Sequence, residues 1–168
     1  MASVTTPAQA PVAAERVRID GLFETHLTVT DLDRSIAFYR DTLGLPLASV
    51  FPERPVAFFW IGAPGQAMLG LWPSNNVLRL RLHLAFAVSL PELLAAPAKL
   101  RAAGITPRGF GGAPVDEPQV IAWMPAAVLY FEDPDGHNLE FVAMLDAPPR
   151  PDSGLLPWSA WQATAGRS

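Results

Sequence analysis

The 168-residue sequence contains no cysteine, which excludes disulfide bonds, thiolate metal ligands and a cysteine nucleophile. No apolar run approaches the roughly 18–20 residues that a membrane-spanning helix needs. Cations are also scarce, since 12 Lys and Arg residues stand against 16 Asp and Glu residues, a formal net charge of -4. A nucleic-acid surface needs clustered cations to neutralise phosphates, so this balance argues against nucleic acid as a partner.

The two ends of the chain differ in composition from its middle. Residues 1–20 are rich in Ala, Pro and Thr, which predicts a flexible tail. Their start lacks the basic and apolar regions of a secretory signal, so we expect a cytoplasmic protein. Residues 146–168 form a second, Pro-rich tail that carries Trp158 and Trp161 on a short helical turn. Residues 21–145 remain for a single domain.

The middle of the chain contains the same order of predicted elements twice. A strand over 22–30 leads into a helix from about Asp31 to Gly44, and three short strands follow at 47–51, 56–61 and 67–72. The pattern restarts with a strand over 79–88 and a helix that a Ser89 capping box begins. Pro97 is expected to kink or interrupt this helix. The later strands are predicted at 105–110, 120–124, 127–131 and 138–144. The sequence therefore predicts an α+β fold of two βαβββ units, about 21–73 and 79–145.

Two histidines and one glutamate stand out on the polar faces of these strands. His26 and His83 lie in the first strand of each unit, at positions that we take as equivalent, and face away from the apolar residues. Glu140 lies in the last strand of the second unit. Two imidazoles and a carboxylate that converge form a three-ligand site for a divalent transition metal with open positions. The alternative is three unrelated polar residues on a solvated sheet face.

Three segments together resemble the vicinal oxygen chelate superfamily: HLTVTDLDRSIAFYRDTLGL (26–45), LHLAFAV (82–88) and LYFEDPDGHNLEFVAML (129–145). That superfamily includes glyoxalases, fosfomycin-modifying thiol transferases, extradiol dioxygenases and bleomycin-binding proteins. The resemblance covers about residues 21–145 and implies a curved mixed sheet around a metal cleft. It places His26, His83 and Glu140 on the ligand positions of one divalent ion, with Mn, Fe, Ni or Zn as candidates. It also implies that Thr28 and Tyr130 contact the substrate or handle protons beside Glu140.

Other residues suggest how a substrate is held. Arg81 lies on the face of His83 and suits an anionic group, although a solvated arginine at a strand end is slightly more typical. Four large apolar side chains suit a pocket wall, although such residues are more often core: Trp60, Met68, Trp72 and Trp123. In the Asp-Pro-Asp-Gly turn, Asp133 and Asp135 are expected to cap backbone amides, and His137 to hydrogen-bond locally.

Departures from each subfamily leave the reaction open. Resemblance implies a fourth ligand, usually glutamate, at the position of Gly70 in lactoylglutathione lyases, and glycine supplies no carboxylate. Glu24 is an alternative base on the same face as His26. Extradiol dioxygenases usually have four units and an additional histidine, for which only His137 is left. The potassium loop of glutathione-using thiol transferases is replaced by VDEPQVIAWMPAA (115–127).

We therefore expect a metal-dependent protein that binds a small substrate through vicinal oxygens and carries out lyase, isomerase or thiol-transfer chemistry. The alternatives are an extradiol-type dioxygenase and a non-catalytic protein that confers resistance by binding a drug or metabolite. Two units leave open sheet edges, which predicts a homodimer. In that dimer His26 comes from one chain, and His83 and Glu140 come from the other.

Overall fold

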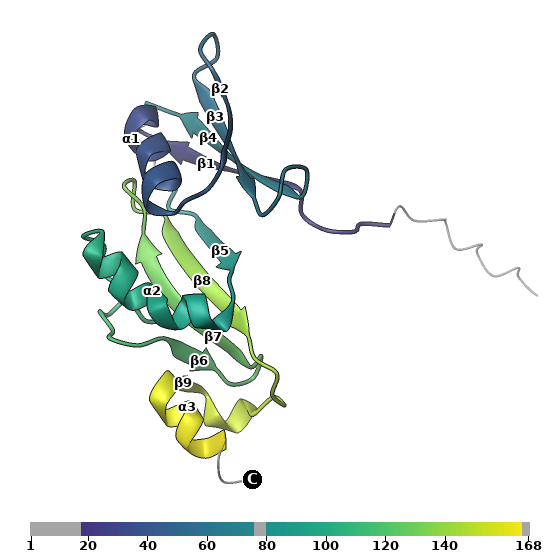
Figure 1. The fold of residues 1–168 in the computed structure, drawn as a ribbon, viewed down its shortest axis with the longest axis vertical. Coiled ribbons are helices and arrows are strands. Elements are labelled where there is room, and N and C mark those ends of the chain that lie inside the picture. The colour runs from purple at the N-terminus through teal and green to yellow at the C-terminus, as the bar shows by residue number, and fades with distance from the viewer. Residues whose placement is uncertain (1–17, 76–79, 166–168) are drawn as a thin grey trace, which may run out of the picture.

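The computed structural model describes residues 18–75 and 80–165, so most of the predicted N-terminal tail and Arg79 lie outside the described residues. Two βαβββ units follow one another along the long axis of the molecule (Figure 1). The strands of the first unit are β1 (Glu24–Val29), β2 (Leu47–Phe51), β3 (Val56–Ile61) and β4 (Ala67–Pro73). Those of the second are β5 (His83–Ala87), β6 (Gln119–Ile121), β7 (Ala126–Glu132) and β8 (Asn138–Met144). The expected α+β fold with a repeated unit is confirmed.

The first unit is a four-stranded sheet in the order β1-β4-β3-β2, with β1 parallel to β4. Helix α1 (Leu32–Ala37) begins where the Asp31 carboxylate accepts the Arg34 N–H at 3.0 Å. It continues as a π-helical turn, η1 (Phe38–Thr42), and the chain then leaves through Gly44 at φ 72°. This backbone conformation favours glycine, so the residue that marks the helix end in the sequence also marks it in the structure.

The second unit is a five-stranded sheet in the order β5-β8-β7-β6-β9, in which β9 (Leu155–Pro157) comes from the C-terminal segment. Helix α2 (Leu90–Ala102) begins at the Ser89 cap, whose hydroxyl accepts the Glu92 N–H. The expected interruption at Pro97 is wrong, because the helix runs through that residue. Four residues of α2 are buried in the core: Leu93, Ala96, Pro97 and Leu100. Their packing holds the helix together although proline supplies no backbone donor.

Two segments differ from the sequence-based expectation. The strand predicted over 105–110 is absent, and only Arg108 makes isolated bridges, to Tyr130 and Pro114. Pro107 and the glycines of this segment disfavour a continuous ladder. The C-terminal segment instead contains an unexpected strand, β9 (Leu155–Pro157), which pairs with β6, and the helix α3 (Trp158–Ala165). Trp161 is 4% exposed, so this segment packs on the body of the protein.

The faces of the first strand alternate as the sequence predicts. Leu27 and Val29 are buried in a core that both units share, whereas Glu24, His26 and Thr28 are exposed. The two sheets remain separate. Within the described residues, β1 pairs only with β4 and β5 pairs only with β8, so both histidine-bearing strands lie at sheet edges.

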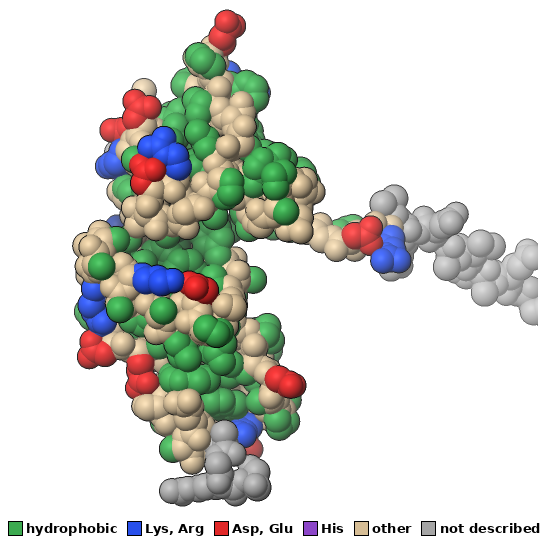
Figure 2. Space-filling view, in the orientation of Figure 1, with side chains coloured by type: hydrophobic (Ala, Val, Ile, Leu, Met, Phe, Trp, Pro, Cys, Tyr) green, Lys and Arg blue, Asp and Glu red, His purple; other side chains and the backbone are tan. Residues whose placement is uncertain are grey.

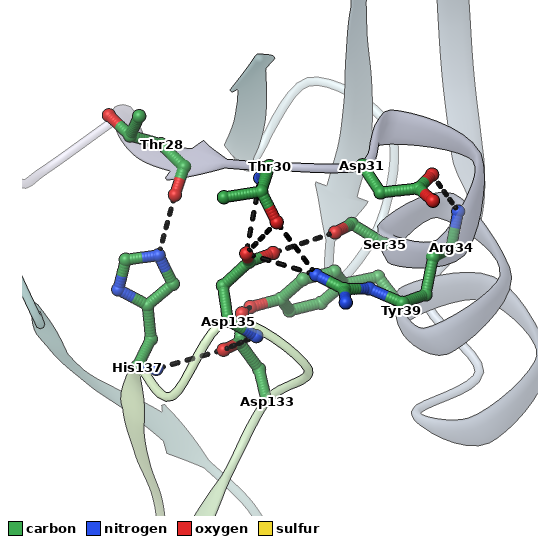
Figure 3. Close-up of polar contacts among 9 residues, drawn as sticks. All are labelled: Thr28, Thr30, Asp31, Arg34, Ser35, Tyr39, Asp133, Asp135 and His137. Carbon is green, nitrogen blue, oxygen red and sulfur yellow. Dashed lines mark hydrogen bonds and ion pairs between the residues drawn. The ribbon is translucent and has the colours of Figure 1, made fainter. Parts of the chain in front are cut away.

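Polar side chains join the two units at the β7–β8 turn (Figure 3). The Tyr39 hydroxyl donates to the Asp133 carboxylate at 2.8 Å, and burial together with Asp133 raises the pKa of Tyr39, which keeps it protonated. The second oxygen of Asp133 accepts the backbone N–H groups of Asp135 (2.9 Å) and His137 (2.8 Å). The expected capping role of Asp133 is confirmed, and its carboxylate also ties the turn to the first unit.

Asp135 and His137 also reach across to the first unit. Asp135 caps a backbone amide as expected, namely that of Thr30, whereas the His137 side chain bonds to distant segments and not locally, contrary to the expectation. Asp135 accepts hydrogen bonds from the Thr30 N–H (3.1 Å) and the Ser35 hydroxyl (3.3 Å), and pairs with Arg34 at 3.0 Å. His137 is 2% exposed, and its Nε2 lies 2.8 Å from the Thr28 carbonyl oxygen. Its Nδ1 accepts the Leu82 N–H at 3.1 Å. Thr28 and Thr30 precede their partners His137 and Asp135 by more than one hundred residues in the sequence. Local sequence patterns do not reveal contacts between segments so far apart.

The Asp135 contacts predict a pH dependence of stability. Burial acts to raise the pKa of Asp135, but hydrogen bonds from Thr30 and Arg34 outweigh it and hold the pKa below its ordinary value. Ionised Asp135 therefore stabilises the fold above the unfolded-state pKa of about 3.9, and this contribution is lost as pH falls through the lower folded-state pKa. We expect Asp135→Asn to lose less stability than the wild type between about pH 6 and pH 3 in urea unfolding.

The matched control for this test is Asp152→Asn, which removes an exposed carboxylate from the C-terminal segment. Its stability is expected to fall with pH as that of the wild type does. Parallel pH profiles for Asp135→Asn and the wild type would contradict the assigned role of Asp135.

Candidate metal centre

The second unit brings His83 and Glu140 together. His83 Nε2 lies 3.0 Å from Glu140 Oε2, and His83 Nδ1 lies 3.0 Å from the Asn138 carbonyl oxygen. His83 Nδ1 also lies 3.2 Å from Asn138 Nδ2, so the Asn138 carbonyl suits a protonated Nδ1 and the Asn138 side-chain amide suits an unprotonated one. With Nδ1 protonated, the Nε2 lone pair and the Glu140 carboxylate are two acceptors that can bind one cation between them. In that tautomer the pair has the donor chemistry of a metal site, and the Asn138 carbonyl orients the ring as outer partners of metal ligands do.

Tyr130 lies beside this pair and is largely buried. Burial and then the Glu140 charge raise the pKa of Tyr130, so its hydroxyl remains a proton donor and is no base at neutral pH. Burial also raises the pKa of Glu140, although His83 and a hydrogen bond from Tyr130 oppose that shift. A buried carboxylate that costs free energy to ionise gains from a nearby cation.

The first unit brings His26 to Glu24. His26 Nε2 contacts Glu24 Oε1, and the ring packs against Trp72 and Phe58 at centroid distances of 5.1 and 6.1 Å. His26 lies opposite Gly70 in the strand register. A Cβ atom at Gly70 would stand 2.5 Å from His26 Cδ2, so the imidazole occupies the space that a side chain there would need.

These two pairs stay apart in a single chain. Within the residues that the structure describes, no group of three or more His, Cys, Asp or Glu side chains is placed to hold a metal ion. The predicted ligands therefore divide into halves, with His83 and Glu140 in one and His26 in the other. The three-ligand set stays a prediction, and it requires a second copy of the chain.

The pairing of β5 with β8 in the second unit gives a reference for finding the equivalent residues of β1 and β4 in the first unit. The Asn138 N–H donates to the Leu82 carbonyl at 2.9 Å, and His83 is the next residue of β5. Asn138 lies opposite His83 and two residues before Glu140. In the second unit, therefore, His83 comes one residue after Leu82, whose carbonyl accepts the first bond between the strands. Glu140 comes two residues after Asn138, whose N–H donates that bond.

The first unit shows that His26 and His83 are not equivalent, contrary to the expectation. There the Met68 N–H donates to the Phe23 carbonyl at 2.7 Å, so the next residue of β1 is Glu24. Two positions beyond Met68 is Gly70, which corresponds to the carboxylate position of the second unit. Glu24 therefore occupies the position of the second unit's histidine, and His26 lies two residues further along β1.

The predicted pocket wall is partly assembled in the first unit. Residues directly opposite on neighbouring strands share a sheet face. Trp60 lies opposite Met68, and Met68 lies opposite Glu24, so these side chains share the face of His26. Trp72 and Thr28 lie on that face too. Trp123 does not join them, since it lies between β6 and β7 and is 63% exposed.

Arg81 lines a cavity of about 280 Å³ next to Tyr130. Its guanidinium packs against Gly136, and it lies 3.8 Å from Glu132. Arg108 lines the same cavity, yet it was not predicted from the sequence. Its backbone bonds to Tyr130 in both directions, at 2.7 and 2.9 Å. The surrounding glycines and prolines give this loop no periodic pattern, so the sequence carried no signal for it.

The paired βαβββ units define the fold of the vicinal oxygen chelate proteins. Residues 21–141 match the family model "Glyoxalase/Bleomycin resistance protein/Dioxygenase superfamily". The chain belongs to this superfamily, which confirms the resemblance inferred from the sequence.

Individual relatives span several reactions. A lactoylglutathione lyase from Haemophilus influenzae is 27% identical over 129 residues, which cover 72% of this chain and 90% of that protein. An integron cassette protein, HFX_CASS4, from the mobile metagenome of the Halifax Harbour sewage outfall has a TM-score of 0.63 and 32% identity, over 75% of this chain and 100% of that one. The fosfomycin resistance protein FosX from Listeria monocytogenes, complexed with Mn(II) and sulfate, has a TM-score of 0.56 and 21% identity, over 77% and 94% of the two chains. That last likeness concerns the fold alone.

Proposed function

We propose that this protein is a metal-dependent homodimeric enzyme that binds a small substrate through two vicinal oxygens. Each centre takes His26 from one protomer and His83 and Glu140 from its partner, and holds one divalent ion such as Mn, Fe, Ni or Zn. The observation that carries the proposal is that each unit holds an imidazole Nε2 against a carboxylate at the edge of its sheet.

Dimerisation is supported by two features of the surface. The edges of β1 and β5 have no strand partner on their outer side within the described residues, and such edges favour pairing with another chain. Large apolar side chains are also exposed, and Figure 2 shows hydrophobic side chains gathered between the two units and on the surface of the lower unit. Those that are more than half exposed are Ile19, Leu22, Phe23, Leu80, Phe110, Trp123 and Met144. Exposed apolar surface of this kind favours association.

No helix in the described residues is long and apolar enough to cross a membrane.

The residues around the centre suit a polarised, anionic substrate. When bound, the ion supplies Lewis-acid stabilisation of a developing oxyanion. Tyr130 stays protonated because its pKa is raised, and its single O–H, which donates to Glu140 in this structure, turns to a substrate oxygen beside Glu140 when substrate binds. Arg81 and Arg108 hold an anionic group in the adjacent cavity. Trp60, Met68 and Trp72 supply an apolar wall from the other protomer, on which Thr28 is a further polar contact.

Lyase or isomerase chemistry and thiol transfer are the two reactions that we propose. The likeness to a lactoylglutathione lyase favours the first. A panel of hemithioacetals, an epoxide with thiols, and catechols under oxygen, each run with every candidate metal, distinguishes them from dioxygenation. Protein that purifies with stoichiometric divalent metal supports the enzyme. A protein that binds a ligand tightly without metal supports the alternative, a drug- or metabolite-binding protein.

Mixing two defective variants tests the shared centre. His26→Ala and Glu140→Gln each damage a different half, so a mixed dimer contains one intact centre and one doubly damaged centre. Random mixing therefore restores metal to about a quarter of the centres, as symmetry of the dimer requires. Metal content after co-refolding, measured by atomic emission, checks this.

The control pairs His83→Ala with Glu140→Gln, which damage the same half and restore nothing on mixing. If the first mixture also stays empty while native mass spectrometry detects heterodimers, the centres are not shared. Light scattering that finds a monomer at micromolar concentration would also refute the proposal.

A further inference from the structure

We propose that Glu24 is a fourth protein ligand of the shared centre, which then contains two imidazoles and two carboxylates. This inference rests on the proposed function, because Glu24 and His26 meet the other pair only in the dimer. It assigns to Glu24 the carboxylate that Gly70 does not supply.

The first observation is the contact itself. Glu24 and His26 are two residues apart on β1, so their side chains leave the same face of the strand. Glu24 Oε1 contacts His26 Nε2, and both side chains are over one third exposed, at 37% and 46%. Two donors at this spacing on an edge strand can bind one ion together, while open positions remain for the partner's ligands and for substrate.

The second observation is the register. Glu24 follows Phe23 as His83 follows Leu82, so it occupies the position at which the second unit places the His83 imidazole. In the second unit the imidazole comes from the first strand and the carboxylate from the last strand. In the first unit the carboxylate comes from that equivalent position, and the His26 ring covers Gly70. Each unit thus presents one imidazole and one carboxylate, with the two donor types exchanged.

The third observation is steric. A side chain at position 70 would meet His26 Cδ2 at 2.5 Å and Phe58 Cε1 at 3.1 Å. While His26 holds its position, no carboxylate fits there. Glu24 is the acidic side chain in contact with His26, so it is the group placed to complete the set.

A different role for Glu24 makes a different prediction. As a positioning residue, Glu24 would accept a hydrogen bond from the His26 Nε2–H and leave Nδ1 to bind the ion. Glu24→Gln keeps an oxygen acceptor at this position but loses the charge, whereas Glu24→His replaces the carboxylate with an imidazole, which is itself a metal ligand. The two variants therefore separate a ligand from an orienting partner.

The experiment uses the full chain as the dimer, titrated with Co(II) and Zn(II) in competition with a chelator. We expect Glu24→Gln to lose more than about 100-fold in affinity, since loss of an outer partner alone costs about 10–100-fold. Glu24→His should recover to within about tenfold of the wild type, since imidazole is itself a good ligand for these ions. The Co(II) visible spectrum should change in both variants because the ligand set changes. Glu53→Gln, on the exposed β2–β3 turn, should match the wild type.

Each outcome decides the inference. Wild-type affinity and an unchanged Co(II) spectrum in Glu24→Gln would show that Glu24 is no ligand, while the shared centre of the proposed function survives. Loss in Glu24→Gln without recovery in Glu24→His would indicate a positioning role and overturn the inference. Failure of the wild-type dimer to bind any of these ions would overturn the proposed function, and the inference with it. Circular dichroism and dimer mass check that each variant remains folded.

Discussion

Replacing Glu140 with Gln should abolish tight metal binding and turnover together. Glu140 is 7% exposed, and burial raises the pKa of its carboxyl, so the ionised form is costly unless a cation is close. Glutamine keeps the shape but removes the charge that faces His83 Nε2. We expect affinity for Zn(II) or Mn(II) to fall by more than about 100-fold, because the change removes a ligand and not an outer partner.

Chelator competition measures this affinity, and turnover is followed on the best substrate of the panel. Glu53→Gln is again the control, because it removes a distant carboxylate and should leave both quantities unchanged. If Glu140→Gln lost its metal yet retained wild-type turnover, metal-assisted catalysis would be refuted. If it retained its metal, Glu140 would be no ligand.

The joint between the two units consists of the polar contacts that Asp133, Asp135 and His137 of the β7–β8 turn make with the first unit. Of the changes at this joint, we expect Asp133→Ala to be the most destabilising. The buried carboxylate accepts hydrogen bonds from the Tyr39 hydroxyl and from the backbone N–H groups of Asp135 and His137. Alanine leaves these donors without their acceptor, at a cost of about 1–3 kcal/mol for each buried donor that stays unsatisfied. We expect a loss of about 3 kcal/mol or more in the free energy of unfolding, measured by urea denaturation.

Tyr39→Phe is the matched comparison, because it removes one of these bonds and leaves the carboxylate in place. Its expected cost is about 1 kcal/mol. The double variant should cost less than the sum of the two changes, since the residues share a hydrogen bond. A loss below about 1 kcal/mol for Asp133→Ala would mean that water or a repacked turn replaces the carboxylate.

The joint also connects stability to the candidate centre. His137 bonds to the Thr28 carbonyl of β1 and to the Leu82 N–H. Leu82 immediately precedes β5, so one side chain links the strand that carries His26 to the start of the strand that carries His83. Asp135 anchors the start of α1 through Thr30 and Arg34. These contacts fix how the His26–Glu24 pair and the His83–Glu140 pair are placed relative to each other.

Much of the fold was predictable from local patterns. Alternation identified β1, because its apolar residues pack on the shared core while Glu24, His26 and Thr28 face outward. Helix starts were predictable from Asp31 and Ser89, whose side chains cap the first turn. The continuity of α2 through Pro97 was not, because buried contacts with the sheet outweigh the local cost of proline. The strand β9 was missed because its partner β6 is more than thirty residues away.

The sequence by itself determined the repeated βαβββ order, the superfamily and the polar faces that carry His26, His83 and Glu140, because side-chain periodicity and end-capping residues are local properties of the chain. The tertiary structure alone decided which side chains meet. Strand register pairs His83 with Glu140 but gives His26 to Glu24, and it makes Glu24, not His26, the counterpart of His83. It also placed Arg108 beside Tyr130 and bonded the β7–β8 turn to the first unit. Both the strand register and the joint between the units depend on hydrogen bonds between segments that lie far apart in the chain. No local pattern in a single sequence indicates which of these segments will pair.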